Sequence, residues 1–286
     1  MNNYPAKVFL NDRILDHLDA KISVFDRAFL FGDSIYEVMV QINGKFFLKQ
    51  EHLSRLSDCL DKVNINFDVD ILPEKINHLL DLSGLKEKDC LLYIQVTRGI
   101  APRKHRFPKN ANPSLMMYAL PFVLPDINQN QVSVVTVNDE RWHRCDIKTT
   151  SLLGNVLANT CAAEQGAYEA VFIRDGKVTE ASHCNIFFVK DNVVFTHPAN
   201  TFILDGITRK AVINLCNELN LEVCEEAINA DDIPNMDEAF LTGTTTQVAS
   251  VRQIDDYFYY EDDNLGPITK KLQESFLELK NNNHPR

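Results

Sequence analysis

An Asn43-Gly44 dipeptide near the start of the chain narrowly restricts what the surrounding residues can form. It separates two largely apolar runs, 35–42 and 45–48. Asn-Gly suits the left-handed backbone of a two-residue turn, so this stretch predicts a β-hairpin. Two helices and a further strand are expected to follow, at 53–63, 73–80 and 91–97. The first hundred residues therefore predict a small α/β unit.

A proline-containing stretch separates the two halves of the chain. Pro121 and Pro125 are followed by a polar run, a composition typical of a connection between domains. We therefore predict a small domain over 1–120, a linker over 121–131 and a larger domain over 132–286. The larger domain is expected to contain several strands and three helices, at 151–165, 209–219 and 268–280.

Composition restricts the class of protein and its partners. The chain has 286 residues, 45% of them hydrophobic, which is enough to bury a substantial core. Its net charge of −11 provides no basic field for nucleic acid. Seven cysteines without a CxxC pair indicate thiols in a reducing cytoplasm, and no apolar run approaches the roughly 20 residues that a membrane helix needs. We expect a cytoplasmic protein with no nucleic-acid or membrane partner.

The commonest nucleotide, hydrolase and metalloprotease motifs are missing from the sequence. There is no GxxxxGK[ST], GxGxxG after a strand, GxSxG or HExxH. The eight histidines are dispersed, and His143 and His197 are interpreted as structural or surface groups rather than ligands. The sequence therefore predicts no metal site.

Two glycine-containing turns in the second half are suited to an anion. Gly206-Ile207-Thr208 lies where a turn meets a predicted helix, whose first N–H groups and dipole favour a negative charge. The run Gly243-Thr244-Thr245-Thr246 offers further N–H and O–H donors. On shape alone, the plainer interpretation is two ordinary turns, one of which caps a helix through Thr208.

A longer spaced pattern surrounds these turns. It reads Glu180-Ala-Ser-His-Cys-Asn185-Ile-Phe187, then Val194-Phe-Thr196, then Leu204-Asp-Gly206-Ile207-Thr208-Arg209. The pattern resembles the signature of the class IV aminotransferases, and the resemblance extends from about residue 4 to residue 280. It implies pyridoxal phosphate as cofactor and an α/β (α+β) fold of fold type IV, in which a small N-terminal α/β domain precedes a larger α/β pseudo-barrel.

The resemblance also implies which residues hold the cofactor. Lys148, in the stretch Arg-Cys-Asp-Ile-Lys, resembles the Schiff-base lysine, although most lysines are simply solvated. A partly desolvated amine beside cationic groups has a lowered pKa, as that role requires. Glu180 resembles the glutamate that meets the pyridine nitrogen and keeps the ring electron-withdrawing. The remaining cofactor contacts are expected at Arg55, Leu204, Gly206, Ile207, Thr208, Gly243 and Thr244.

Arg55 lies in Glu51-His52-Leu53-Ser54-Arg55-Leu56, one position away from the apolar stripe of a predicted helix. Without the resemblance, a surface salt bridge of little energetic value is the default interpretation. The family pattern has an arginine here that binds the cofactor phosphate, for which a guanidinium is well shaped.

The substrate side of the resemblance points to one branch of the family. Tyr36 and Val38 match the first-strand motif that faces the substrate, and Tyr36 resembles the tyrosine that helps to hold its carboxylate. The basic stretch 96–108 resembles a loop of D-amino-acid aminotransferases. There an Arg-x-His pair, here Arg103 and His105, reaches across a homodimer to the substrate α-carboxylate.

We therefore expect a ping-pong transamination between a D-amino acid, of the D-alanine and D-glutamate type, and 2-oxoglutarate or pyruvate. The alternatives are a branched-chain L-amino-acid aminotransferase or an aminodeoxychorismate lyase of the same family, and a non-enzymatic binding protein. Two departures from the family pattern bear on side-chain preference. Ser34 stands where a second glycine is usual after Gly32-Asp33, and His183-Cys184 replace serines.

Overall fold

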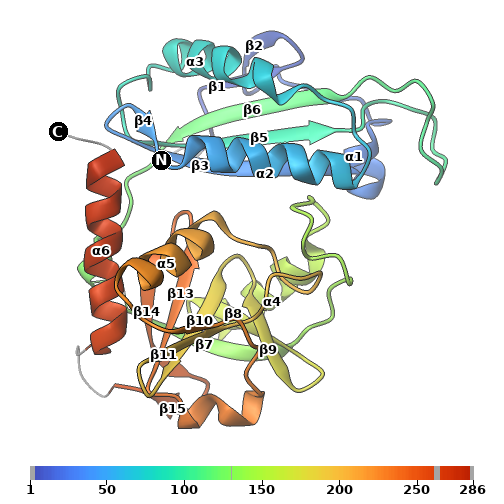
Figure 1. Ribbon diagram of the computed structural model, residues 1–286. Coiled ribbons are helices and arrows are strands. Elements are labelled where there is room, and N and C mark those ends of the chain that lie inside the picture. Colours follow the sequence, from blue (N-terminus) through green and yellow to red (C-terminus); the bar gives the residue numbers. More distant parts are fainter. Residues whose placement is uncertain (1–3, 130, 261–264, 284–286) are drawn as a thin grey trace. The chain divides into compact units, whose positions relative to one another are not determined.

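The computed structural model describes residues 4–129, 131–260 and 265–283, which form two compact units (Figure 1). Unit 1 comprises Met1–Val123 together with Ile147–Ser151, and unit 2 comprises Leu124–Asp146 and Leu152–Arg286. The segment around Lys148 therefore packs with unit 1, although it follows the predicted linker. Residue 130 of that linker lies outside the described residues.

Unit 1 contains a six-stranded antiparallel sheet with the order β2-β1-β6-β5-β3-β4. The predicted hairpin is confirmed, because Asn43 and Gly44 have φ angles of 48° and 78° between β3 and β4. The strands are β1 (Lys7–Leu10), β2 (Arg13–Asp16), β3 (Ser34–Ile42), β4 (Lys45–Phe46), β5 (Cys90–Thr97) and β6 (Ser114–Pro121).

Helices pack on this sheet and complete the first hydrophobic core. They are α1 (Arg27–Phe31), α2 (Lys49–Lys62) and α3 (Leu72–Leu82), with a 3-10 turn η1 (Val69–Ile71). In α2, Leu53, Leu56 and Leu60 recur at helical spacing and are at most 6% exposed. They meet the apolar side chains of β3 and β5, so one stripe of the helix closes one face of the sheet.

Unit 2 contains a nine-stranded mixed sheet, with the order β12-β11-β10-β13-β14-β7-β8-β9 and β15 paired to β14. The pairs β11–β12, β14–β7 and β7–β8 are parallel. The strands are β7 (Gln131–Asn138), β8 (Glu169–Arg174), β9 (Lys177–Ala181), β10 (Asn185–Lys190), β11 (Val193–Thr196), β12 (Val223–Cys224), β13 (Glu238–Gly243), β14 (Gln247–Ile254) and β15 (Tyr257–Phe258).

This sheet must curl, because β9 and β10 are consecutive in the chain but lie five steps apart in the strand order. Five steps in a flat sheet span about 24 Å, whereas the connection from Ala181 to Asn185 reaches at most about 14 Å. The N–H of Ala181 donates to the carbonyl of Cys184 at 2.8 Å, which keeps the turn tight. The strands therefore close toward a barrel (Figure 1), as the predicted fold class requires.

The helices of unit 2 are α4 (Leu153–Glu164), α5 (Ile207–Glu218) and α6 (Pro267–Asn283), with 3-10 turns η2 (Ile127–Gln129) and η3 (Ala230–Asn235). Helix α4 starts two residues later than predicted, because Ser151 still belongs to the segment that packs with unit 1. Helix α5 starts two residues earlier, directly after Gly206. Among the described residues, no helix is long and apolar enough to span a membrane.

A buried carboxylate fixes the start of α6. Glu238 on β13 is 3% exposed and accepts hydrogen bonds from the N–H groups of Ile268 and Thr269 at 2.9 and 2.8 Å. The Thr269 hydroxyl donates a third bond at 2.7 Å. A negative charge at a helix N-terminus is favourable, so this residue joins the helix to the sheet.

We predict that Glu238→Gln lowers the free energy of unfolding of the protein by about 1–3 kcal/mol, because the amide keeps one acceptor and loses the charge. Urea denaturation followed by circular dichroism measures this change. Glu274→Gln, an exposed position on the same helix, is the matched control and should leave stability nearly unchanged. Equal stability of the two variants would contradict the assigned role of Glu238.

Candidate functional site

Lys148 lies in an extended segment of unit 1 that pairs with the start of β3. The carbonyl of Lys148 accepts from the N–H of Tyr36 at 3.0 Å, and Thr149 forms an isolated bridge with Ile35. The N–H of Thr150 donates to the Ser34 carbonyl at 3.2 Å. Backbone bonds on both sides therefore set the position of the lysine.

The Lys148 side chain extends over an aromatic ring. Its Nζ lies 4.3 Å from the centroid of the Tyr36 ring. Tyr36 and Val38 are half-buried and point to the same face of β3, because side chains alternate along a strand. Tyr93 stacks on Tyr36 at 5.7 Å between ring centroids, and Tyr118 continues the stack. Tyr36 thus lies beside the lysine, and Val38 follows on the same face of β3.

Arg55 is not the surface group that its position in the helical pattern favoured. Its side chain is 10% exposed, and its Nε and Nη2 atoms donate to the two oxygens of Glu37 at 2.9 and 2.7 Å. His52 Nδ1 contacts the same carboxylate at 3.0 Å. Burial alone would raise the pKa of Glu37, but Arg55 and His52 outweigh it and hold the pKa well below its usual range. The Nη1 atom of Arg55 takes no part in the ion pair with Glu37.

The loop that is predicted to bind the substrate carboxylate also lies in unit 1. Arg103 and His105 are exposed, and both lie against the ring of Phe31, at 5.2 and 5.6 Å from its centroid. Arg27 fixes the loop by donating to the Lys104 carbonyl at 2.7 Å. The Arg98 guanidinium stacks 3.6 Å from the Phe107 ring. The loop therefore presents two basic side chains on a braced backbone.

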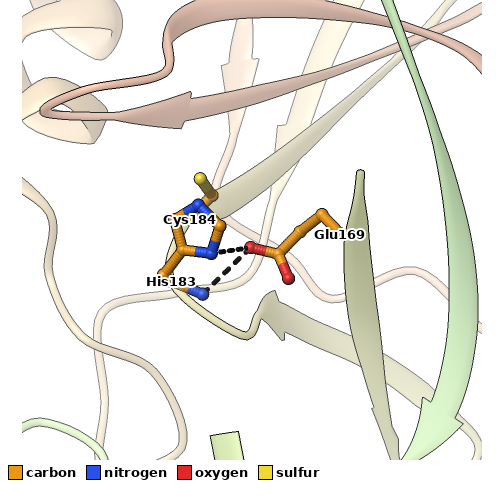
Figure 2. Close-up of side chains that lie close together, drawn as sticks. All are labelled: Glu169, His183 and Cys184. Atoms are coloured by element: carbon orange, nitrogen blue, oxygen red, sulfur yellow. Dashed lines mark hydrogen bonds and ion pairs between the residues drawn. The ribbon is translucent and has the colours of Figure 1, made fainter. Parts of the chain in front are cut away.

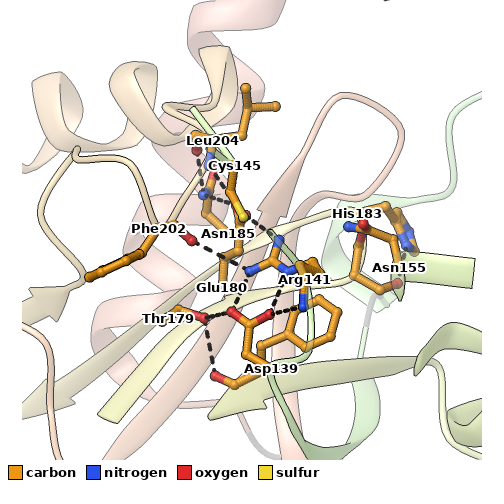
Figure 3. A network of polar contacts seen from close by, with 12 residues as sticks. Asp139, Arg141, Cys145, Asn155, Thr179, Glu180, His183, Asn185, Phe202 and Leu204 are labelled. Atoms are coloured by element: carbon orange, nitrogen blue, oxygen red, sulfur yellow. Dashed lines mark hydrogen bonds and ion pairs between the residues drawn. The ribbon is translucent and has the colours of Figure 1, made fainter. Parts of the chain in front are cut away.

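Glu180 on β9 of unit 2 is 5% exposed and surrounded by donors (Figure 3). Its Oε1 accepts from Arg141 Nη1 at 2.6 Å. Its Oε2 accepts from Asn185 Nδ2 at 3.2 Å and from the N–H of Leu204 at 2.9 Å. A carboxylate has about four acceptor positions, so roughly one remains. Burial raises the pKa of Glu180 to about 7, although Arg141 and the Leu204 N–H act to lower it.

Asn185 connects Glu180 to the start of α5. Its Nδ2 also donates to the carbonyl of Leu204 at 2.8 Å. A Cβ atom on Gly206 would lie only 2.2 Å from Asn185 Oδ1, so only glycine allows this close approach. Asn185 therefore contacts both Glu180 and Gly206, although the three residues are spaced along the sequence signature.

The start of α5 offers free donors to an anion. Among the described residues, no side chain caps this helix, and its first hydrogen bond runs from the N–H of Lys210 to the carbonyl of Gly206. The N–H groups of Ile207 and Thr208 therefore have no partner within the helix. Gly243 ends β13 and Thr244 follows it in the turn to β14. An uncapped helix and a carboxylate with a spare acceptor fit the phosphate and the ring nitrogen of pyridoxal phosphate.

Glu169, His183 and Cys184 form a cluster that the sequence analysis did not predict (Figure 2). Their potential ligand atoms lie within 4.8 Å of one another. The Glu169 carboxylate already accepts from Ser182 Oγ, from the N–H groups of Ala170 and His183, and from the His183 ring. The His183 side chain is 47% exposed, so its partial burial lowers the pKa less than Cys184 and Glu169 raise it, and the pKa is about 11. The cluster is therefore satisfied as a hydrogen-bonded ion pair.

The sequence analysis did not predict the ion-pair partners of the buried carboxylates, and the reason is the same for each of them. Glu37 and Glu169 lie within apolar strand sequences, which is a detectable signal of burial, whereas the strand of Glu180 has only Val178 and Ala181 as apolar residues. Their counterions, Arg55, His183 and Arg141, come from other elements or from a turn. Periodicity identifies a buried charge but does not identify its partner.

The chain is similar over nearly its whole length to known proteins. The family model for amino-transferase class IV matches residues 34–254. The D-alanine aminotransferase of Bacillus licheniformis is 40% identical over 270 residues, which cover 93% of this chain and 94% of that protein. The D-alanine aminotransferase of Staphylococcus aureus strain MSSA476 is 39% identical, over 94% of this chain and 96% of that protein.

A solved structure extends the similarity to the fold. The branched-chain aminotransferase of the thermophilic archaeon Thermoproteus uzoniensis, solved with norvaline, superposes with a TM-score of 0.86 at 25% identity, covering 99% of this chain and 97% of that one. The matched family segment contains Lys148, Glu180 and the start of α5. The sequence signature, the fold and the relatives agree, and the chain belongs to the class IV aminotransferases.

Proposed function

We propose that this enzyme transfers an amino group between a D-amino acid and a 2-oxo acid, with pyridoxal phosphate as cofactor. D-Alanine and D-glutamate are the proposed amino donors, and pyruvate and 2-oxoglutarate the proposed oxo acids. The observation that carries the proposal is the 40% identity, over 93% of the chain, to a D-alanine aminotransferase. The braced basic loop of Arg103 and His105 supports the choice of this branch.

Lys148 is the proposed attachment point of the cofactor. Pyridoxal phosphate, when bound, supplies an aldehyde that condenses with amines and a ring that delocalises the electron pair left at the substrate Cα. Lys148 Nζ, against the Tyr36 ring and held by the backbone pairing of its segment, is the group proposed to move the Cα proton. Because donor and acceptor react in turn through covalent intermediates, the kinetics should be ping-pong.

Unit 2 is proposed to bind the ring nitrogen and the phosphate. Glu180 offers its remaining acceptor position to the ring nitrogen. The N–H groups of Ile207 and Thr208, with Gly206, Gly243 and Thr244, form the proposed phosphate contacts, and the uncapped helix favours the negative charge. Leu204 contributes through its N–H to Glu180.

Tyr36 and Val38 are proposed to face the substrate, with Arg103 and His105 provided by a second copy of the chain in a homodimer. An apolar patch on α4 supports self-association, because Leu153, Val156 and Leu157 are 71%, 56% and 62% exposed on one helical face. The seven cysteines, all within the described residues, are thiols, which supports a cytoplasmic location.

A second candidate is a branched-chain L-amino-acid aminotransferase. It is favoured by the Thermoproteus uzoniensis structure, which is similar in fold over 99% of this chain. Identity to that protein is 25%, against 40% to the D-alanine aminotransferase. The basic loop is the feature that should decide between the two substrate classes.

We predict that D-alanine, but not L-leucine, converts the visible absorption of the cofactor-loaded enzyme to that of the aminated cofactor. Absorption spectra during separate titrations test this. Lys148→Ala should lose the conversion, because the proposed proton-transferring amine is gone, and Lys88→Ala, an exposed lysine, should retain it. Conversion by L-leucine alone would move the enzyme to the branched-chain group.

We predict that Arg103→Ala raises the KM for D-alanine by at least about tenfold, because a charge-assisted bond to the substrate carboxylate is lost. Steady-state kinetics with pyruvate production as readout measure this. Arg106→Ala removes an exposed arginine of the same loop and should change the KM little. An equal effect of both substitutions would show that loop charge in general, not Arg103, is responsible.

Arg55 is proposed to offer Nη1 to the cofactor phosphate while its other nitrogens neutralise Glu37. We predict that Arg55→Leu lowers the free energy of unfolding by about 3–5 kcal/mol, because it removes both guanidinium hydrogen bonds from a buried carboxylate and leaves His52 as its remaining partner. Chemical denaturation of the cofactor-free protein measures this loss. The double variant Glu37→Leu/Arg55→Leu should recover most of it, and a double variant no more stable than Arg55→Leu would contradict the assignment.

The Glu37–Arg55 pair also predicts that the free energy of unfolding depends on pH. The pKa of Glu37 is lower in the folded state than in the unfolded state. Its ionised carboxylate therefore contributes fully to the free energy of unfolding above the ordinary glutamate pKa of about 4.3, and this contribution is lost as the pH falls toward the folded-state pKa. The difference in stability between wild type and the double variant should therefore shrink in acid.

A further inference from the structure

We infer that Arg141 is a positioning residue for Glu180, which it holds oriented and ionised for the ring nitrogen of the cofactor. This inference rests on the proposed function, because it concerns the group that Glu180 is proposed to meet. In the sequence, Arg141 stands out only as part of the stretch before Lys148. Its contacts in unit 2 give it a separate role.

Arg141 belongs to a buried cluster of charges with Asp139, Arg174 and Glu180 (Figure 3). The four side chains are between 0% and 7% exposed. When both carboxylates are ionised, the two positive and two negative charges cancel and the cluster is neutral as a whole. Partners in this arrangement offset one another's desolvation, whereas removal of one leaves an uncompensated charge.

The Arg141 guanidinium is fixed on several sides. Its Nε and Nη2 donate to the two oxygens of Asp139, both at 2.9 Å, while Nη1 reaches Glu180 at 2.6 Å. The guanidinium carbon lies 4.0 Å from the centroid of the Phe172 ring. A planar group held in this way has little rotamer freedom, so it directs a single donor at Oε1 of Glu180.

Asp139 is in turn held by Arg174, with Nη2 of Arg174 at 3.0 Å from Oδ2. The same Nη2 donates to the carbonyl of Arg141 at 3.1 Å. The backbone and the side chain of Arg141 are therefore both tied to the cluster. The arrangement resists the displacement of Arg141 when a positively charged ring approaches Glu180.

The role follows from what Glu180 has to do. Its deep burial raises its pKa to about 7, and Arg141 is the neighbouring cation that acts against this rise. Without Arg141, a larger share of Glu180 would carry a proton at neutral pH. A protonated Glu180 could no longer offer a charged acceptor to the ring nitrogen, and loss of the Oε1 contact would free the carboxylate to rotate.

The first test uses the cofactor-free protein, so it does not depend on activity. With ¹³C-carboxyl-labelled glutamate, the resonance absent from Glu180→Gln identifies Glu180, and its titration gives the pKa. Arg141→Gln should move this titration to higher pH, while Glu238→Gln, which removes a buried charge elsewhere in unit 2, should not. An unchanged titration in Arg141→Gln overturns the inference. If Arg141→Gln does not fold, Arg141→Lys decides, with a smaller shift expected in the same direction.

The second test uses the cofactor-loaded enzyme. Arg141→Gln should lower kcat by about 10- to 100-fold with little change in KM, less than the loss of a directly acting group. The acid limb of its pH profile should move to higher pH, and Arg141→Lys should restore part of both. A kcat loss without a shift of the acid limb would indicate a merely structural role. If wild type fails to react with D-alanine, the proposed function fails, whereas the titration of Glu180 still tests the role of Arg141.

Discussion

A carboxylate inside an apolar sheet must receive hydrogen bonds or a counterion, and this requirement organises both units of the protein. Glu37 is paired with Arg55 in unit 1, and Glu180 is paired with Arg141 in unit 2. Glu238 receives the first N–H groups of α6. Each pairing joins a strand to another element, so the buried charges also fix where helices and turns lie. Arg55 and Glu180, the proposed cofactor contacts, thus belong to the same pairs that join one element to another.

The curled sheet of unit 2 explains why residues spaced along the sequence signature meet. The tight turn after β9 brings Asn185 beside Glu180, and the Asn185 amide then bonds the carbonyl of Leu204. Gly206 packs against the same asparagine and begins α5. One amide therefore links the proposed ring-nitrogen partner to the proposed phosphate contact. Replacing Gly206 by a larger residue would separate the two, because a Cβ atom has no room beside Asn185.

Local sequence predicted the elements well and the long-range partners poorly. The turn at Asn43-Gly44 depends on backbone preferences of a few residues, which the sequence displays directly, and the predicted start of α5 differs from the observed one by two residues. The pairing of Ile35 with Thr149 joins segments more than a hundred positions apart, so no local pattern places Lys148 with unit 1. Arg55 illustrates the same limit, because an arginine beside an apolar stripe is buried only if another element provides a carboxylate.

The departures from the family pattern each have partners within their own unit. Ser34 Oγ lies 2.5 Å from Thr150 Oγ1 and accepts from Gln95 Nε2 at 3.2 Å, which ties the lysine segment more firmly to β3. His183 gives the buried Glu169 a counterion, and Cys184 Sγ lies 3.2 Å from Thr246 Oγ1. Because none of these changes leaves a buried charge unpaired, they can alter the neighbourhood of Lys148 and Glu180 without disturbing the charge balance on which Glu180 depends.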